Sequence, residues 1–185
     1  LTAAAGQSYL WSNGDTNQAI TSNMAGTYHS IVTTTNGCSD TTATYTTTVF
    51  ADADTSVTAS GPLSFCNGGS VTFTAVSGQN YLWNTGDTTQ SITASTSGNY
   101  SATVTTNDGC VGSTMPKFVN VFADADTRIS VSQTLFCASD SATLSADINQ
   151  VYSWNTGETT QSIVVNTTGD YYLTTTTTDG CVGVS

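Results

Sequence analysis

A twelve-residue stretch with an aromatic core occurs three times in the 185-residue chain and constrains the fold more than any other feature. The middle copy, Tyr81 to Ile92, reads YLWNTGDTTQSI, and related copies run from Tyr9 to Ile20 and from Tyr152 to Ile163. Each copy has an apolar strand-like segment, a glycine-acid turn and a second short segment. Self-similarity at a fixed period is typical of tandem repeats.

The period follows from the spacing of residues that recur. Trp11, Trp83 and Trp154 lie 72 and 71 residues apart, and Phe50–Asp54 returns unchanged as Phe122–Asp126. In this register the chain begins inside one repeat and ends inside another. We therefore expect the C-terminal part of one repeat in residues 1–52, a complete repeat in residues 53–124, and the N-terminal part of a third in residues 125–185.

The residue pattern within one repeat indicates strands. Val71, Phe73 and Ala75 alternate with threonines, which is the period of a half-buried strand. Asp108-Gly109 is a strong hairpin signal. No window has helical periodicity. The sequence predicts an all-β class with tandem immunoglobulin-like β-sandwich repeats of about 72 residues, and the middle repeat is expected to have strands near 55–59, 71–75, 81–84, 90–94, 100–105 and 117–122.

The charge balance excludes some partners. Lys and Arg number 2 against 13 Asp and Glu, which gives a formal net charge of -11. Such a surface repels nucleic acid and anionic lipid, so we expect neither as a partner. No apolar run approaches the roughly 18 residues that a membrane-spanning helix needs, so membrane insertion is not expected.

Regularly spaced cysteines predict disulfide bonds. Cys66 and Cys110 are 44 residues apart, as are Cys137 and Cys181. A repeat of this size builds only a marginal core, and closing such a loop would stabilise it by about 4 kcal/mol. We expect the pairs 66–110 and 137–181 in an oxidising, extracellular compartment. Cys38 then needs a partner outside the chain.

The pairing depends on how many times the chain crosses the sandwich. Four strands are expected between Cys66 and Cys110, and four crossings return the chain to the end where it started. This count favours a bond within each repeat. A seven-strand immunoglobulin count would add a fifth crossing, and the bond would then join neighbouring repeats, for example Cys66 to Cys181.

Four short motifs of the middle repeat together resemble a known family. They are Cys66–Phe73 (CNGGSVTF), Tyr81–Trp83, Gly98–Tyr100 and Asn107–Cys110. The combination is similar to the immunoglobulin-like and PKD-like repeats of giant cell-surface adhesins that gliding bacteria export by the type IX secretion route. The resemblance covers the whole chain and implies β-sandwich beads that form stalks or fibres without catalysis. It departs from antibody domains, because Tyr100 and Cys110 are ten residues apart and the antibody inter-sheet disulfide is not expected.

An acidic pair stands at each expected boundary between repeats. Asp52 and Asp54 form one pair, and Asp124 and Asp126 form the other. Alternate residues of an extended segment point the same way, so each pair offers carboxylates to Ca²⁺. Calcium needs six or more oxygen ligands and only two are in view, so a solvated acidic linker is the favoured interpretation. No other cofactor is expected.

Other candidate residues favour structural roles. The three tryptophans lie in apolar segments, where core packing is favoured over sugar stacking. Tyr28, Tyr100 and Tyr171 each follow a glycine-containing turn and resemble corner tyrosines. His29, the single histidine, is expected on the surface. No nucleophile-base pair can be assembled, so we expect no enzyme.

Thr41, Thr88 and Ser141 each follow an aspartate, in a pattern similar to O-glycan acceptor sites of the same bacterial group. The leading hypothesis is a stalk or fibre segment of a secreted, surface-displayed protein, whose partners are neighbouring repeats or identical subunits. The alternative is a carbohydrate-binding module that would take a surface glycan.

Overall fold

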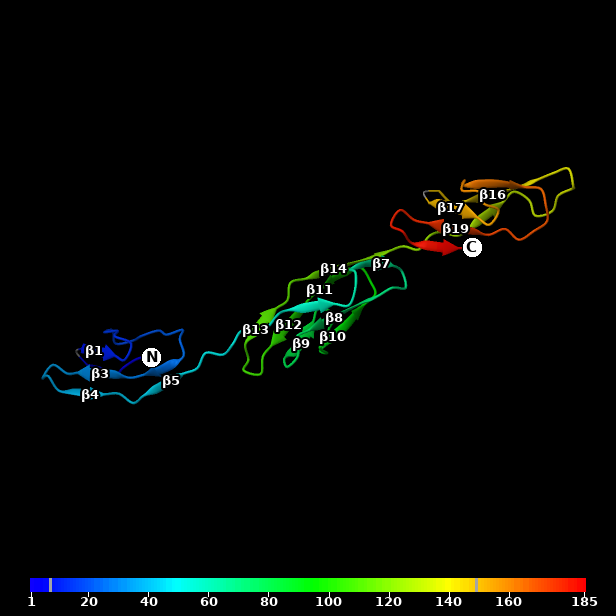
Figure 1. The fold of residues 1–185 in the computed structure, drawn as a ribbon. Helices are drawn as coiled ribbons and strands as arrows, with labels where there is room; N and C mark the ends of the chain where they lie inside the picture. Colours follow the sequence, from blue (N-terminus) through cyan, green and yellow to red (C-terminus); the bar gives the residue numbers. More distant parts are fainter. Residues whose placement is uncertain (7, 149) are drawn as a thin grey trace. The chain divides into compact units, whose positions relative to one another are not determined.

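The computed structural model describes residues 1–6, 8–148 and 150–185. The described residues form β-strands and no helix, which confirms the all-β prediction (Figure 1). By its internal contacts the chain divides into two compact units, residues 1–52 with 108–110 and residues 53–107 with 111–185. The predicted boundary between residues 124 and 125 stays a prediction. Within the described residues, no helix has the length and apolar character that crossing a membrane requires.

The first unit has two small sheets. Its strands are β1 (Ser8–Trp11), β2 (Gly26–Tyr28), β3 (Ser30–Thr33), β4 (Ser39–Thr41) and β5 (Tyr45–Thr47). One sheet has the order β1-β3-β4, and the other pairs β2 with β5. Ala3, Trp11, Ile20 and Tyr28 form the core between them.

The middle repeat is a two-layered sandwich. Its strands are β6 (Val57–Ala59), β7 (Ser64–Cys66), β8 (Val71–Ala75), β9 (Asn80–Trp83), β10 (Ser91–Ala94), β11 (Gly98–Tyr100), β12 (Ala102–Thr105), β13 (Val111–Ser113) and β14 (Lys117–Phe122). One layer has the order β10-β8-β6, and the other consists of the sheets β13-β12-β9 and β11-β14-β7. These two sheets form one layer because only Ser101 separates β11 from β12. Strand β7 runs parallel to β14, whereas the other pairs are antiparallel, which is an immunoglobulin-like arrangement.

The third repeat reproduces most of this pattern. Its strands are β15 (Ile129–Val131), β16 (Ala142–Ala146), β17 (Val151–Trp154), β18 (Ser162–Val165), β19 (Leu173–Thr176) and β20 (Val182–Val184). The sheets have the orders β15-β16-β18 and β17-β19-β20. These match β6-β8-β10 and β9-β12-β13 of the middle repeat.

The core lies between the layers and follows the alternation in the sequence. Val71, Phe73 and Ala75 of β8 are buried, and Trp83 of β9 and Val119 of β14 join them. The indole N–H of Trp83 donates to the carbonyl of the residue six positions later at 2.9 Å, and the other two tryptophans do the same. All three tryptophans are buried, which confirms their role in core packing.

The corner tyrosines also take the predicted role. The hydroxyl of Tyr100 donates to the carbonyl of Thr96 at 3.0 Å, and Tyr171 makes the same bond to Thr167. In the first unit the hydroxyl of Tyr28 donates to the carbonyl of Met24 at 3.3 Å. Each hydroxyl therefore fixes the turn that precedes its own tyrosine.

The path from β8 to β10 includes one more crossing of the sandwich than the sequence predicted. Strand β8 ends at Ala75, and β9 begins only a few residues later at the same end of the sandwich. Strand β10 begins there too, because the amide of Ala75 donates to the carbonyl of Gln90 at 3.0 Å and the side-chain amide of Gln90 donates back at 2.8 Å. Residues 84–90 therefore carry the chain back without forming a strand, and the chain crosses the sandwich five times between Cys66 and Cys110.

Two strands of the middle repeat were not expected. Strands β7 and β13 have three residues each, and no run of alternating apolar and polar residues marks them. The other expected strands are present, and β6 is an edge strand that pairs with β8, as its position suggested. The turn at Asp108-Gly109 is confirmed by the positive φ of Gly109, +86°.

Candidate functional site at the disulfide between repeats

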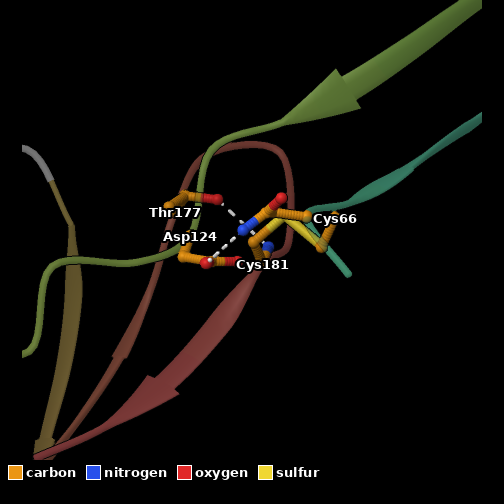
Figure 2. The surroundings of a disulfide bond; sticks show 5 residues. Cys66, Asp124, Thr177 and Cys181 are labelled. Carbon is orange, nitrogen blue, oxygen red and sulfur yellow. Dashed lines mark hydrogen bonds between the residues drawn. A yellow bond between two sulfur atoms is a disulfide. The ribbon is translucent and has the colours of Figure 1, made fainter. Parts of the chain in front are cut away.

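A disulfide bond joins the middle repeat to the third. It connects Cys66, the last residue of β7, to Cys181, which lies in the hairpin between β19 and β20 (Figure 2). The two Cα atoms are 5.6 Å apart, and the cysteines are 115 residues apart in the chain. The Cys181 side chain is almost fully buried.

The predicted pairs 66–110 and 137–181 are therefore wrong. Five crossings place Cys66 and Cys110 at opposite ends of the middle repeat, so a bond between them cannot form. The expected count of four was one short because residues 84–90 make a crossing that no strand marks. The same return occurs in the third repeat, where Ala146 and Gln161 exchange the same two hydrogen bonds at 2.9 and 3.0 Å.

The hairpin that carries Cys181 is held by a threonine. The amide of Cys181 donates to the Thr177 hydroxyl at 3.0 Å, and the amide of Thr177 donates to the carbonyl of Cys181 at 2.9 Å (Figure 2). Gly180, with φ of +87°, makes the turn, and its amide donates to the carbonyl of Thr177 at 3.0 Å. These bonds hold the hairpin that carries Cys181 in one conformation beside Cys66.

On the other side, the residue after Cys66 holds the linker. The side-chain amide of Asn67 donates to a carboxylate oxygen of Asp124 at 2.9 Å (Figure 2). The backbone amide of Asn67 also donates to the carbonyl of Phe122, the last residue of β14, at 2.9 Å. The loop that bears Cys66 and the linker that leaves the middle repeat are thus tied together at two points.

The far end of the linker packs closely against the third repeat. The buried hydroxyl of Thr175 in β19 donates to the carbonyl of Asp126 at 3.0 Å. Gly183 in β20 lies so close to the linker that a Cβ atom there would be 2.5 Å from the Thr127 methyl group and 3.1 Å from the Ala125 carbonyl oxygen. Glycine is therefore required at this position by the close approach of the backbone.

A charged pair ends the linker. The carboxylate of Asp126 accepts hydrogen bonds from the Arg128 guanidinium, the shortest at 2.6 Å, and from the Arg128 backbone amide at 2.9 Å. These bonds lower the pKa of Asp126 to about 2. Arg128 is exposed and Asp126 is partly exposed, so the main effect of the pair is to order the entry into β15.

Three of the four aspartates considered for calcium accept hydrogen bonds from other groups of the protein. Asp124 accepts the Asn67 amide, Asp126 binds Arg128, and Asp54 accepts the amide of Ser56 at 2.9 Å, which lowers the pKa of Asp54. Asp52 is exposed. In the part of the chain that the structure describes, no three acidic, histidine or cysteine side chains gather as a metal-binding group. A calcium site at these aspartates stays a prediction.

The remaining predicted residues are accessible. Thr41, Thr88 and Ser141 are exposed, as glycan acceptors must be, and their modification stays a prediction. His29 is partly exposed between β2 and β3. Cys38 has an exposed free thiol, and its predicted partner outside the chain remains untested.

The sequence did not predict the roles of two residues beside the disulfide or of one residue that fixes the return of the chain before β10. Asn67, Thr177 and Gln90 act through hydrogen bonds that depend on the fold. The signal for Gln90 was present, because a glutamine stands at the same place in all three copies of the aromatic motif. The same kind of signal was present for Thr177, because Thr34 and Thr106 also stand four residues before a cysteine. Asn67 carries no such signal, since Ala138 takes its place in the third repeat.

Comparison of the sequence with protein-family models and with curated proteins found no match. Two solved structures resemble the chain weakly. One contains the N-terminal four Ig domains of Dscam1 isoform 6.44, with 11% identity and a TM-score of 0.27 over 97% of this chain and 63% of that one. The other is SGBP-B of the Bacteroides ovatus mixed-linkage glucan utilization locus in complex with a mixed-linkage heptasaccharide, with 15% identity and a TM-score of 0.21 over 95% and 55%. The chain spans less than two thirds of either protein, and the assignment of the fold rests on the strand pairing above.

Proposed function

We propose that the chain is a structural stalk or fibre segment of a secreted, surface-displayed repeat protein. The observation that carries the proposal is the Cys66–Cys181 bond, which joins one sandwich covalently to the next. A bond within a repeat would stabilise only that repeat. A bond between repeats also limits how the two can move, which is the property that a stalk needs.

The rest of the junction supports the same function. The linker is held at Asp124 by Asn67 and at Asp126 by Thr175, so both of its ends are attached to a sandwich. Linkers without such contacts allow domains to move independently. The resemblance to type IX adhesin repeats adds that the repeats project a binding function located elsewhere in the polypeptide.

The disulfide also supports a location outside the cytosol. Structural disulfides persist in oxidising compartments and are rare in reducing ones. The formal charge of -11 keeps such a surface hydrated and disfavours contact with nucleic acid. Catalysis is not part of the proposal.

The alternative of a carbohydrate-binding module has less support. Such modules stack sugars on exposed aromatic rings, and the tryptophans best suited to this are buried, with their indole N–H groups bonded to backbone carbonyls. Affinity electrophoresis of the chain in gels containing β-glucans would reveal glycan binding. Retarded migration would favour this alternative over the stalk.

The stalk proposal is tested by small-angle X-ray scattering on the oxidised chain and on a Cys66→Ala, Cys181→Ala variant. We expect the variant to sample a broader range of dimensions while its circular dichroism spectrum stays that of a β protein. The Cys38→Ala variant is the matched control and should scatter like the parent. Identical scattering from all three would contradict a role of the bond in orienting the repeats. Labelling of intact source cells with antibodies raised against the chain tests display at the surface.

A further inference from the structure

Three asparagines of the chain are followed directly by glycine, in the pairs Asn13-Gly14, Asn36-Gly37 and Asn67-Gly68. Asparagine is a thermolabile residue, and a following glycine leaves the next backbone nitrogen unhindered, so such pairs lose the side-chain amide most readily. All three pairs are exposed to solvent. Burial therefore does not distinguish them, and the hydrogen bonds of the three turns do.

In the first two pairs the glycine amide closes a turn. The amide of Gly14 donates to the carbonyl of Trp11 at 2.8 Å, and the amide of Gly37 donates to the carbonyl of Thr34 at 2.9 Å. In both turns the asparagine is the third residue and the glycine is the fourth. An N–H group that donates a hydrogen bond must break it before its nitrogen can react, so both turns protect their asparagine.

The third pair lies one position earlier in its turn. This turn runs from Cys66 to Gly69, and the amide of Gly69 closes it by donating to the carbonyl of Cys66 at 3.0 Å. Gly68 is the third residue, with φ of +83°, and a Cβ atom there would meet open space. The amide at this position is not used by the hydrogen bond of the turn. Within the described part of the chain, the Gly68 amide donates no other hydrogen bond.

The reaction at this pair balances with water alone. The Gly68 nitrogen bonds to the side-chain carbonyl carbon of Asn67 and gives up its proton, and the side-chain nitrogen leaves with that proton as ammonia. Water then opens the resulting cyclic imide at either of its carbonyl groups. The products are an aspartate or an isoaspartate, and in both a carboxylate replaces the amide. No enzyme, oxidant or cofactor takes part.

The amide that would be lost is the one that holds the linker. Its nitrogen donates to a carboxylate oxygen of Asp124 at 2.9 Å, and this hydrogen bond is exposed. Exposed bonds open locally without unfolding of the domain, so the bond does not prevent the reaction. Loss of the amide removes the donor and leaves two carboxylates at the same contact, where like charges repel. One of the two ties between the Cys66 loop and the linker is then broken.

The hairpin at Asn36 provides an internal comparison. Asp108-Gly109 and Asp179-Gly180 stand at the equivalent place in the other two repeats. Both form turns in which the glycine has a positive φ, as Gly37 does. A carboxylate is therefore compatible with this turn, and conversion of Asn36 should leave the structure unchanged. Conversion of Asn67 is different because the lost amide has a partner in the linker.

We propose that Asn67 is a site of spontaneous deamidation, and that its conversion releases the linker after β14 from the loop that carries Cys66. The Cys66–Cys181 bond stays in place, so the repeats remain joined while one contact that orders the linker is lost. The site is a property of this loop and does not depend on the proposed stalk function.

The rate is tested on the oxidised parent chain, incubated at mildly alkaline pH. Samples are reduced and digested with pepsin, and mass spectrometry follows the change from amide to acid in each asparagine peptide. We expect Asn67 to convert at least about threefold faster than Asn13 or Asn36, because only its glycine amide is free of the turn's hydrogen bond. In the reduced chain unfolded in urea, the three rates should agree within about twofold, because the turns are then lost.

The consequence is tested by hydrogen–deuterium exchange of the linker, residues 123–127. In an Asn67→Asp chain these amides should exchange at least about threefold faster than in the parent, because the linker is less ordered. The Asn36→Asp chain is the matched control and should exchange like the parent. Circular dichroism checks that both variants are folded. Aged parent chain, separated from fresh chain by ion exchange, gives the same comparison without any substitution.

Two results would overturn the proposal. One is conversion of Asn13 or Asn36 in the folded chain at a rate equal to or above that of Asn67. The other is linker exchange that stays at the parent rate both in the Asn67→Asp chain and in the aged chain. Faster exchange in the Asn36→Asp chain as well would also contradict it, because the effect would then not come from the contact with Asp124.

Discussion

Removal of the disulfide between repeats should destabilise both repeats at once. The variant is Cys66→Ala with Cys181→Ala, and the cysteines are 115 residues apart. On the chain-entropy estimate, a loop of this size contributes about 5 kcal/mol at 25 °C, against about 4 kcal/mol for the 44-residue loops expected from the sequence. The loss should therefore approach half of the total stability of a typical domain.

The assay is urea unfolding followed by tryptophan fluorescence in a Trp11→Phe background, so that only Trp83 and Trp154 report. We expect one transition in the oxidised parent. In the double variant we expect earlier transitions that no longer coincide for the two repeats. Circular dichroism before unfolding checks that the variant is folded.

The single variant Cys137→Ala distinguishes the two pairings. If Cys137 were bonded to Cys181, as the sequence suggested, this change would cost several kcal/mol. In the structure Cys137 is exposed and outside the disulfide, so its replacement should change stability by no more than about 0.5 kcal/mol. A loss of several kcal/mol in the Cys137→Ala variant would refute the five-crossing topology, because only the pairing 137–181 gives Cys137 a bond to lose.

Three further changes test the junction, the core and the ion pair at Asp126. Gly183→Val should destabilise the junction by about 1–3 kcal/mol, because its side chain would meet the linker, whereas Gly61→Ala has open space and should be neutral in thermal melts. Trp83→Ala should cost about 3–5 kcal/mol in urea unfolding, and Leu82→Ser on the exposed face should cost little. Asp126 has its pKa lowered from 3.8 to about 2, so its contribution is present above pH 3.8 and is lost as pH falls toward 2. In the Asp126→Asn variant the melting temperature should therefore depend less on pH between about 2 and 3.8. An unchanged dependence would contradict a stabilising role of the ion pair.

Much of the fold followed from residue patterns. The alternation at Val71, Phe73 and Ala75 predicted a strand with one buried face, and Asp108-Gly109 predicted a hairpin turn, because both are local properties of the backbone. Burial of Trp83 followed from its place in an apolar strand. These features do not depend on which strands pair.

The disulfide could not be predicted with the same security because it depends on topology. The segment from Tyr81 to Ile92 has the pattern of a hairpin, and its glycine-acid turn is the same whether the next segment pairs with the first or returns to its starting end. In the structure β9 and β10 lie in different sheets. The hydrogen bonds between Gln90 and Ala75 show that the chain returns to its starting end, and they join residues that are 15 positions apart. One undetected crossing was enough to exchange the cysteine partners.

The position of the disulfide has a mechanical consequence. When the chain is pulled by its ends, tension passes from Cys66 directly to Cys181 and bypasses the residues between them, 67–180. At about 3.3–3.6 Å per residue these 114 residues correspond to roughly 380–410 Å of contour length that an oxidised chain cannot release. The Trp83 and Trp154 cores lie within this shielded loop, so a stretched segment can extend only through its outer residues until a reductant cuts the bond.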